Sequence, residues 1–255
     1  MRVGLIGSGN MARALARGWG EPVLCSDGGS GRAAALAAEL GGRAADNLEV
    51  AQEADVVVLC HKPAQLEPVA REISGHARAV VSVLGSTSHA QLAACYPRTP
   101  LLRLIPNTPV QVRRGVTCHV LAQDVALRPD PELQARVLER FALLGAVIDV
   151  PEALAEVAMA VSSLGPAYQA LLVEAQVDAA IRHGLGATLA SRLAVQTMEG
   201  TAALLSELGH DTLALRREVT SPGGSTARGL DALERGGVRA AFQAAMDRVL
   251  RVGGC

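Results

Sequence analysis

The stretch RVGLIGSGNMARAL, residues 2–15, decides the fold of the amino-terminal half. An apolar run passes at once into glycines and then into a helical pattern, which predicts a strand, a tight turn and a helix. Gly7, Gly9 and Ala12 have the spacing G-x-G-x-x-A. In this spacing the first glycine permits the turn, the second lets the backbone approach a pyrophosphate, and the small third residue allows close packing of helix and strand. The segment therefore predicts a dinucleotide-binding turn, with a tight turn that binds nothing as the alternative.

Short runs rich in β-forming residues alternate with helical patterns up to about residue 150. The runs are RVGLI, PVLCS, DVVVLC, AVVSVL, LLRLI, GVTCHVL and AVIDV. Continuous apolar runs such as DVVVLC are typical of strands buried on both faces of a parallel sheet. A helix is expected over 131–144, with Asp130-Pro131 at its start and Gly145 at its end. The alternation predicts an α/β, doubly wound domain over residues 1–150.

From Pro151 onward the β-rich runs disappear and helical patterns follow one another. They cover about 151–183, 188–208, 225–235 and 238–252. Gly165-Pro166 is expected to break the first of them. Alanine and leucine occupy more than one face of these helices, which indicates burial against a surface beyond this chain. We expect a C-terminal all-α dimerisation domain over residues 151–255, with a self-contained bundle as the alternative.

The composition excludes several classes of partner. Aromatic residues are 2% of the chain, which argues against base-stacking nucleic-acid binding. A formal net charge of −1 without a basic run argues against steering toward nucleic acid or membranes. The amino-terminal MRVGLI leaves no room for a signal peptide, and the longest charge-free helical run, 157–173, is short for a membrane span. These features predict a cytoplasmic protein with neither nucleic acid nor membrane as a partner.

The cysteines and histidines show no metal-binding pattern. The five cysteines are odd in number and scattered along the chain: Cys25, Cys60, Cys95, Cys118 and Cys255. Reduced thiols fit this arrangement better than a disulfide framework or a zinc site. We therefore expect no bound metal.

The end of the second strand, CSDGGSGR, bears on which dinucleotide binds. An acidic residue at this place usually accepts from the ribose hydroxyls of NAD, whereas hydroxyl groups and arginine suit the 2′-phosphate of NADP. Asp27 therefore indicates NAD(H), while Ser26, Ser30 and Arg32 suit NADP(H). The two indications conflict, and the cofactor expected is NADP(H) or NAD(H).

The segment REVTSPGGSTARGL, residues 217–230, concentrates hydroxyls and backbone N–H groups at the start of a helical pattern. Unpaired N–H groups and the helix dipole favour an anion at such a position. The paired glycines let the backbone close around a small ligand, and Pro222 stiffens the loop. We interpret the segment as a carboxylate cradle, with an elaborate N-cap as the alternative.

Four motifs, in this order, make the chain resemble the pyrroline-5-carboxylate reductase family over nearly its whole length. They are GSGNM, HKP, IPNTP and VTSPGGSTARGLDALERGGV, and GPAY, EAQVDAAIRHGL and AVQT fit the helical segment before the last. The resemblance implies an N-terminal Rossmann-type domain and a helical domain that interlocks with a second subunit, giving a homodimer or a ring of dimers. It implies an NAD(P)H-dependent oxidoreductase that acts on a C=N bond and reduces a small cyclic imino acid, 1-pyrroline-5-carboxylate, to L-proline, the last step of proline biosynthesis.

The resemblance also implies site residues at matching positions. Those expected to bind the cofactor are Ile6, Gly7, Ser8, Gly9, Asn10, Met11, Ser26, Asn47, Cys60, His61, Lys62, Pro63, Val83, Leu84 and Gly85, with Asn107 at the nicotinamide edge. Those expected to bind the substrate are Glu152, Thr220, Ser221, Gly223, Gly224, Ser225 and Thr226. Thr226 is the expected catalytic residue, in reach of the ring nitrogen and acting by positioning. The alternatives are a packing or surface role for His61 and a turn-forming role for Asn107.

Departures from the family's motifs bear on the substrate. Ser163 and Leu164 stand where relatives have glycine and serine, and Leu84 and Ser86 replace smaller residues. Glu218 precedes the cradle, where a carboxylate would repel the substrate's own carboxylate or stabilise an iminium. The alternative functions are therefore a reductase of a different cyclic imine and a non-catalytic regulatory relative.

Overall fold

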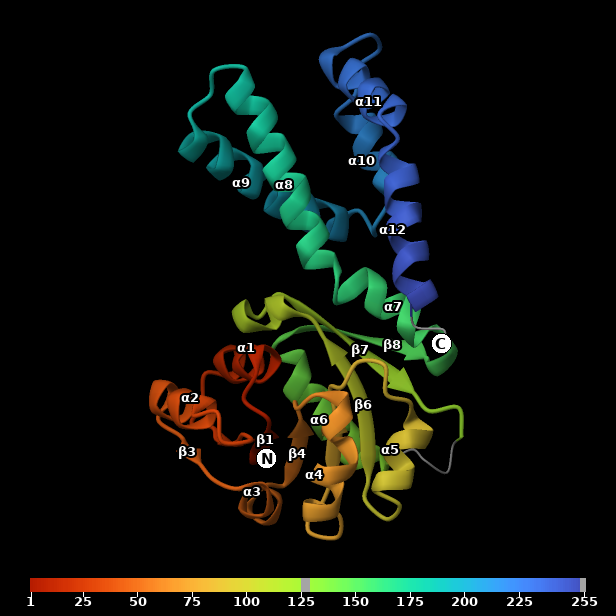
Figure 1. Cartoon of the computed structure of the whole chain (residues 1–255). Coiled ribbons are helices and arrows are strands. Elements are labelled where there is room, and N and C mark those ends of the chain that lie inside the picture. Colours follow the sequence, from red (N-terminus) through yellow and green to blue (C-terminus); the bar gives the residue numbers. More distant parts are fainter. Residues whose placement is uncertain (125–128, 253–255) are drawn as a thin grey trace. The chain divides into compact units, whose positions relative to one another are not determined.

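The computed structural model describes residues 1–124 and 129–252 (Figure 1). The chain divides into two compact units, unit 1 up to Pro166 and unit 2 from Ala167 onward. The domain boundary expected between residues 150 and 151 stays a prediction, since packing units and inherited domains need not coincide.

Unit 1 is built on an eight-stranded sheet in the order β3-β2-β1-β4-β5-β6-β7-β8. Its strands are β1 (Val3–Ile6), β2 (Leu24–Ser26), β3 (Arg43–Ala44), β4 (Val56–Leu59), β5 (Val80–Ser82), β6 (Leu101–Pro106), β7 (Gly115–Leu121) and β8 (Gly145–Pro151). Strands β1 to β6 are parallel, β7 is antiparallel to β6, and β8 is parallel to β7. The strand order reverses at β1, which lies between β2 and β4. Ligands of open α/β sheets bind at the carboxyl ends of the strands at such a point.

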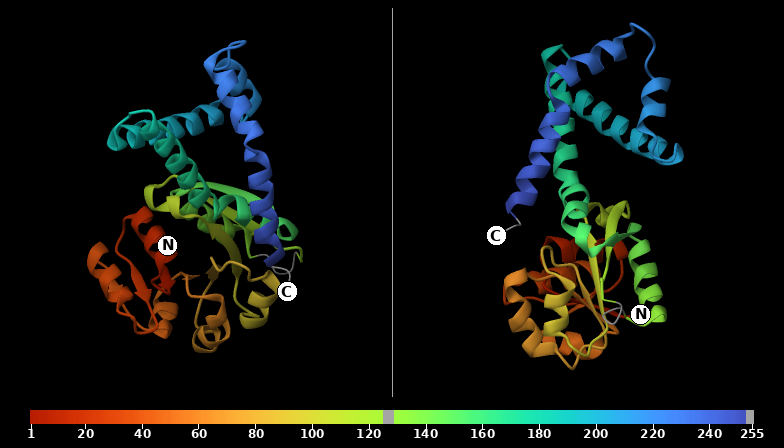
Figure 2. Two further views of the ribbon diagram at one scale, coloured as in Figure 1. Left: turned by 45° about the horizontal axis from the view of Figure 1, so that its top comes forward. Right: turned by 90° about the vertical axis from the view of Figure 1, so that its right-hand side faces the viewer.

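Helices cover both faces of the sheet, as the edge-on view in Figure 2 shows. One face is covered by α1 (Asn10–Trp19), α2 (Arg32–Leu40) and α6 (Pro131–Ala142), and the other by α3 (Asn47–Glu53), α4 (Leu66–Ile73) and α5 (His89–Cys95). The sheet thus has a first core under α1, α2 and α6 and a second core under α3, α4 and α5. Successive strand side chains point to opposite faces, so Leu5 packs in the first core and Ile6 in the second. Both cores are apolar, which is why DVVVLC has no polar alternation. The α/β, doubly wound prediction is confirmed.

The helix expected over 131–144 is confirmed in its main features. Asp130 accepts hydrogen bonds from the backbone N–H groups of Glu132 and Leu133, at 3.1 Å and 3.0 Å. Val137 and Phe141 are buried in the first core. The sequence did not anticipate β3, because a two-residue strand carries no recognisable period.

Unit 1 also contains the short 3₁₀ helices η1 (Pro63–Gln65), η2 (Thr108–Val112) and η4 (Glu152–Leu154) and the α-helix α7 (Ala155–Ser162). Helix α7 packs through Ala155, Ala158 and Met159 against Ile105 and Cys118 of β6 and β7. The predicted break at Gly165-Pro166 is confirmed, because α7 ends at Ser162 and the next helix begins at Gly165.

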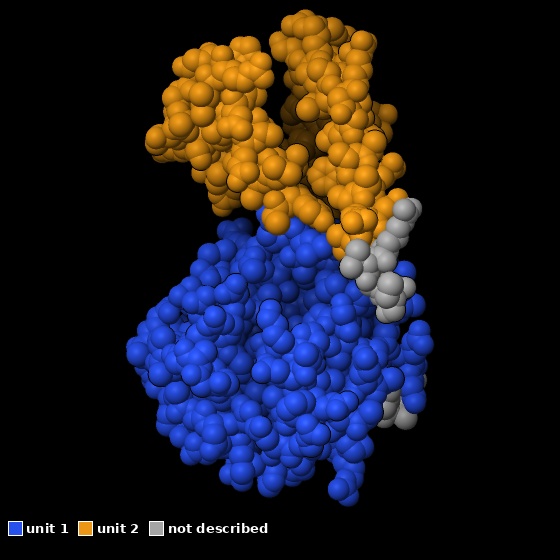
Figure 3. Space-filling model, in the orientation of Figure 1, with its two compact units in different colours: residues 1–166 blue, residues 167–255 orange. Residues whose placement is uncertain are grey.

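Unit 2 is helical, and Figure 3 colours it orange. Its elements are α8 (Gly165–Arg182), which starts in unit 1, α9 (Ala187–Glu207), α10 (Thr212–Glu218), α11 (Ser225–Arg235) and α12 (Val238–Val252). Helix α10 was not expected; Asp211 caps it by accepting from Leu213 and Ala214 N–H groups, each at 2.9 Å. In the described part of this unit the buried apolar side chains are Ala190 and Ala194.

Large apolar side chains of unit 2 remain exposed within the single chain. Leu171, Leu189, Leu193, Val195, Leu213, Leu233 and Phe242 are each at least two-fifths exposed. An exposed apolar surface of this extent is typical of a protein–protein interface. Within residues 1–124 and 129–252, no helix combines the length and apolar character that crossing a bilayer requires.

Candidate functional site

A cleft with a volume of about 920 Å³ lies at the carboxyl ends of β1, β4 and β5. Its size is in the range of small-molecule and cofactor sites. Of the predicted cofactor residues, those that line it are Ile6, Gly7, Ser8, Gly9, Asn10, Met11, Asn47, Cys60, His61, Lys62, Pro63, Val83, Leu84 and Gly85. The structure therefore brings together predicted residues from four separate segments of the chain at the point where the strand order reverses.

The glycine turn has the geometry that an anion site requires. Gly7 has φ +96°, and a Cβ atom there would lie 2.7 Å from the His61 backbone nitrogen, so only glycine fits. At Gly9 a Cβ atom would meet nothing within 4 Å, which leaves the backbone open toward the cleft. Gly9 is also the N-cap of α1 and no side chain caps this helix. Its first N–H groups are therefore available to phosphate oxygens, and a dinucleotide's pyrophosphate fits here.

Ser26 lies beneath the cleft and does not line it. Its side chain is buried, and its hydroxyl donates to Oδ1 of Asn47 at 2.6 Å. The Asn47 amide in turn donates to Glu72 at 2.6 Å, and Ser8 Oγ donates to the Ser26 carbonyl at 2.9 Å. Ser26 thus orients Asn47 and Ser8, both of which reach the cleft.

Asp27 anchors the turn between β2 and α2. Its carboxylate accepts from Gly29 N at 2.8 Å, from Ser30 N and Oγ at 3.1 Å and 3.0 Å, and from Ala33 N at 2.8 Å. The Ala33 hydrogen bond is the main cause that lowers the pKa of Asp27 below its ordinary value. Each carboxylate oxygen already accepts two hydrogen bonds. Asp27, Gly28, Ser30 and Arg32 all line the cleft, and among the described residues no ion pair involves Arg32.

The HKP segment follows β4 at the cleft. His61 Nδ1 lies 2.9 Å from the Lys62 carbonyl, and burial lowers the pKa of its ring. His61 Nε2 is buried without a hydrogen-bond partner in the described structure. Burial raises the pKa of the adjacent Cys60 thiol to about 12, so this thiol is neutral at physiological pH.

Sequence reasoning missed one face of helix α4. Pro68, Val69 and Glu72 of α4, together with its N-cap residue Gln65, line the cleft beside the HKP segment. Their spacing of i, i+3, i+4 and i+7 is one face of a helix that begins after Pro63. That periodicity was the signal available in the sequence.

Asn107 is not among the residues that line the cleft. It is 7% exposed, donates from Nδ2 to the Ser162 carbonyl at 3.0 Å, and accepts at Oδ1 from Val116 N at 2.8 Å. Both ends of its amide therefore tie backbone segments together, which favours the turn-forming alternative. Its neighbour Thr108 lines the cleft instead.

Glu152, a predicted substrate residue, belongs to unit 1 and begins η4. Its Oε1 accepts from the His89 backbone N–H at 2.8 Å and lies 3.1 Å from His89 Nδ1. Partial burial acts to raise the pKa of Glu152, but the His89 hydrogen bond and the charges of His89 and Arg103 outweigh it, so the pKa lies below its ordinary value. A carboxylate is thus held ionised in a largely buried setting.

The other predicted substrate residues lie in unit 2, in the loop after α10 and in the first turn of α11. Gly223 has φ +68°, and Gly224 is the N-cap of α11 with no side chain capping that helix. A Cβ atom at Gly224 would overlap the Ser221 hydroxyl, so any larger residue there would force the Ser221 side chain to turn away. Thr220 Oγ1 is buried with no hydrogen-bond partner in the described structure.

Ser225 and Thr226 form the first turn of α11. Without a side-chain cap, their N–H groups are free to meet an anion, and their hydroxyls add donors. Arg228 donates from Nη1 to the Gly223 carbonyl at 2.9 Å and from Nη2 to Ser225 Oγ at 3.4 Å, which places a cation against the same loop. The loop has the donors and the charge that a small carboxylate requires.

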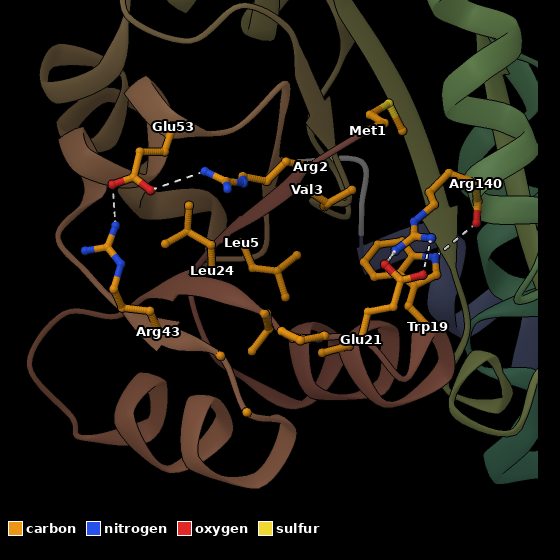
Figure 4. A pocket seen from close by; sticks show the side chains of 15 residues that line it. Met1, Arg2, Val3, Leu5, Trp19, Glu21, Leu24, Arg43, Glu53 and Arg140 are labelled. Atoms are coloured by element: carbon orange, nitrogen blue, oxygen red, sulfur yellow. Dashed lines mark hydrogen bonds and ion pairs between the residues drawn. The ribbon is translucent and has the colours of Figure 1, made fainter.

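A second cavity of about 480 Å³ lies at the amino end of β1, as the close-up in Figure 4 shows. Its charged side chains are paired with one another. Arg140 donates to Glu21 at 2.8 Å, and Glu53 accepts from both Arg2 and Arg43. Because these charges are paired and the cavity lies away from the carboxyl ends of the strands, we assign it no part in the site.

No group of three or more His, Cys, Asp and Glu side chains in residues 1–124 and 129–252 has an arrangement that would hold a metal ion. The described cysteines, Cys25, Cys60, Cys95 and Cys118, are free thiols.

Two family models match the chain. Residues 2–86 match the model described as NADP oxidoreductase coenzyme F420-dependent, and residues 152–253 match pyrroline-5-carboxylate reductase dimerisation. The first match covers most of the strands and turns that build the cleft. The second covers the helical segments, and the protein is accordingly a homo-oligomer.

Three similar proteins are described as pyrroline-5-carboxylate reductases. The chain is 36% identical to a pyrroline-5-carboxylate reductase of Synechocystis sp., over 77% of this chain and 73% of that protein. It is 34% identical to pyrroline-5-carboxylate reductase 3 of Mus musculus, over 96% and 92% of the two chains. The solved structure of 1-pyrroline-5-carboxylate reductase from Streptococcus pyogenes superposes with a TM-score of 0.88 at 28% identity, covering 99% and 98%. The chain therefore belongs to the pyrroline-5-carboxylate reductase family.

Proposed function

We propose that this protein reduces 1-pyrroline-5-carboxylate to L-proline with NAD(P)H, the last step of proline biosynthesis. The observation that carries the proposal is the loop 220–226 at the uncapped start of α11, in a chain whose other unit holds the dinucleotide cleft. The substrate is a cyclic imine that bears a carboxylate, and such a loop supplies the donors that its carboxylate needs. Binding of a dinucleotide alone would not require the hydrogen-bond donors of this loop.

The cleft of unit 1 binds the cofactor in this proposal. The turn Gly7–Met11 holds the pyrophosphate at the start of α1, and residues Cys60–Pro63 and Val83–Gly85 line the rest of the cleft. The nicotinamide supplies the hydride, and the protein contributes binding and orientation.

NADP(H) is the preferred dinucleotide in this proposal. Asp27, the residue that would accept from a ribose hydroxyl, already accepts hydrogen bonds on both oxygens from its own turn. Ser30 and Arg32 line the adjoining part of the cleft and suit a 2′-phosphate. The description of the family model matched by residues 2–86 agrees with this preference.

The loop of unit 2 binds the substrate carboxylate. The N–H groups of Ser225 and Thr226 face it from the first turn of α11, and the Thr220 hydroxyl, which has no partner among the described residues, adds a donor. Thr226 also orients the ring nitrogen. Because a threonine hydroxyl is a weak acid, Thr226 acts by positioning and does not ionise.

We propose a dimer, or a ring of dimers, as the assembly. Exposed Leu189 and Leu193 lie one turn apart on α9, and unit 2 buries few apolar side chains of its own in the described residues. A second subunit would cover this surface. We also propose a cytoplasmic location, which the described free thiols support.

Oxidation of NADPH and NADH, followed by the nicotinamide absorbance with and without 1-pyrroline-5-carboxylate, tests the function. We expect substrate-dependent oxidation that is faster with NADPH. Oxidation with the six-membered homologue but not with 1-pyrroline-5-carboxylate would favour a reductase of a different cyclic imine. Protein that binds NADPH but oxidises it with neither imine would be the non-catalytic relative.

A further inference from the structure

The loop between β5 and α5 forms one wall of the cofactor cleft. Val83, Leu84 and Gly85 line the cleft, and α5 begins four residues later at His89. Ser86, between them, has φ +53°, a left-handed conformation that a residue with a side chain adopts at a cost. Other parts of the structure must therefore hold this loop in place.

Three contacts from the segment 152–159 hold it. The His89 backbone N–H donates to Glu152 Oε1 at 2.8 Å, and Ser86 Oγ donates to Glu156 Oε2 at 3.5 Å. At Gly85 a Cβ atom would lie 3.4 Å from Met159 Sδ, so α7 also packs directly against the backbone of the loop. One side of the loop thus faces the cofactor cleft and the other rests on η4 and α7.

A buried arginine fixes the two carboxylates. The Arg103 side chain is 3% exposed, with Nη1 4.0 Å from Glu152 and Nη2 3.7 Å from Glu156. A buried guanidinium needs opposite charges near it, because the cost of removing it from water is not otherwise offset. Arg103, on β6, therefore keeps Glu152 and Glu156 together beside the loop.

We infer that Glu152 and Glu156 are positioning residues for the cofactor: held by Arg103, they fix the loop 83–89 in the conformation that binds the nicotinamide nucleotide. The segment 152–159 matches the dimerisation family model, yet it packs on the nucleotide-binding sheet. The segment 152–159 therefore shapes the cofactor cleft through the loop 83–89, without contacting the cofactor itself. This role differs from the substrate contact expected for Glu152. Of its two tests, only the measurement of the KM for the imine rests on the proposed function.

The test measures the dissociation constant of NADPH by calorimetry, without imine, for Glu152→Ala, Glu152→Gln and Glu156→Gln. Glu139→Gln, an exposed glutamate on α6, is the matched control. A loop that is no longer held in position binds the cofactor more weakly. For Glu152→Ala we therefore expect about a tenfold rise in the NADPH dissociation constant. A smaller rise is expected for Glu152→Gln, which keeps an oxygen to accept from the His89 N–H. We also expect the KM for 1-pyrroline-5-carboxylate, at saturating NADPH, to change less than about threefold.

An unchanged NADPH dissociation constant with a raised imine KM in Glu152→Gln would overturn the inference and place Glu152 at the substrate. If the Glu152 variants do not fold, Glu156→Gln decides, because the Glu156 side chain is 47% exposed and we expect its replacement to leave the fold intact. Wild-type NADPH dissociation constants in Glu156→Gln and Ser86→Ala would then equally overturn the inference. A wild-type protein that binds NADPH but reduces no imine would remove the proposed function and leave this binding test standing.

Discussion

Asp27 accepts a hydrogen bond from the backbone N–H of Ala33 at 2.8 Å, and so satisfies a donor in the first turn of α2. The residue that most resembles a ribose ligand in the sequence is thereby part of the turn's own structure. Because Asp27 is occupied in this way, we expect Arg32, which suits a 2′-phosphate, to decide the preference for NADPH over NADH.

Replacing Arg32 with alanine should weaken the use of NADPH. The loss of a charged donor to the 2′-phosphate corresponds to about a tenfold rise in the KM for NADPH, with little change for NADH. The ratio of the two kcat/KM values, compared with that of Arg71→Ala on α4, measures the effect. An unchanged ratio would show that Arg32 does not meet the phosphate.

Replacing Asp27 with alanine should destabilise unit 1. Loss of a side-chain cap to a helix typically lowers the free energy of unfolding by about 0.5–2 kcal/mol. The folded-state pKa of Asp27 is lowered, so its charged form stabilises the fold above the ordinary aspartate pKa of about 3.9, and this contribution is lost as the pH falls through the folded-state pKa. Urea unfolding of wild type and variant should therefore differ most near neutral pH and converge in acid. If the difference in the free energy of unfolding between wild type and variant did not decrease in acid, the charge of Asp27 would not be what stabilises the fold.

Replacing Thr226 with alanine should lower kcat/KM for the imine by about tenfold, the scale of one lost hydrogen bond to a charged group. The NADPH dissociation constant should stay at the wild-type value, because the cofactor binds to unit 1. Thr226→Ser keeps the hydroxyl and should recover most of the activity. Unchanged steady-state kinetics in Thr226→Ala would remove this residue from the site.

Replacing Arg228 with methionine should raise the KM for the imine by about fivefold. The variant keeps an unbranched apolar stem but removes the cation and the hydrogen bond to the Gly223 carbonyl. Inhibition by L-proline, which carries the same carboxylate, should weaken in parallel. If the KM for the imine and the inhibition constant of L-proline both kept their wild-type values, Arg228 would not contribute to carboxylate binding.

Replacing Leu193 with aspartate should dissociate the oligomer. Leu193 is 52% exposed in the single chain, and a charge buried in an apolar interface is strongly unfavourable. Light scattering after gel filtration should show a shift toward the monomer mass. Leu143→Asp, on the exposed side of unit 1, is the control and should keep the wild-type mass.

Local chemistry made much of the fold predictable. The break before α8 follows from Gly165-Pro166, and the start of α6 follows from Asp130-Pro131, because proline and capping residues act on their immediate neighbours. The reversed direction of β7 and β8 had no such signal. Strand direction depends on partners far along the chain, which a local pattern does not encode.

The sequence by itself determined the residues of the dinucleotide turn and of the loop 220–226, because spacing, glycine content and helix starts are local properties. Only the tertiary structure decided what each polar group near them does. Asn107 looked like a ligand, yet its amide is used by backbone groups of Ser162 and Val116 that folding brings to it. The carboxylate of Asp27 is used within its own turn, by Gly29, Ser30 and Ala33. The charges of Arg103 and Glu152 meet for the same reason, since a buried charge takes its partner from whatever segment the fold packs against it.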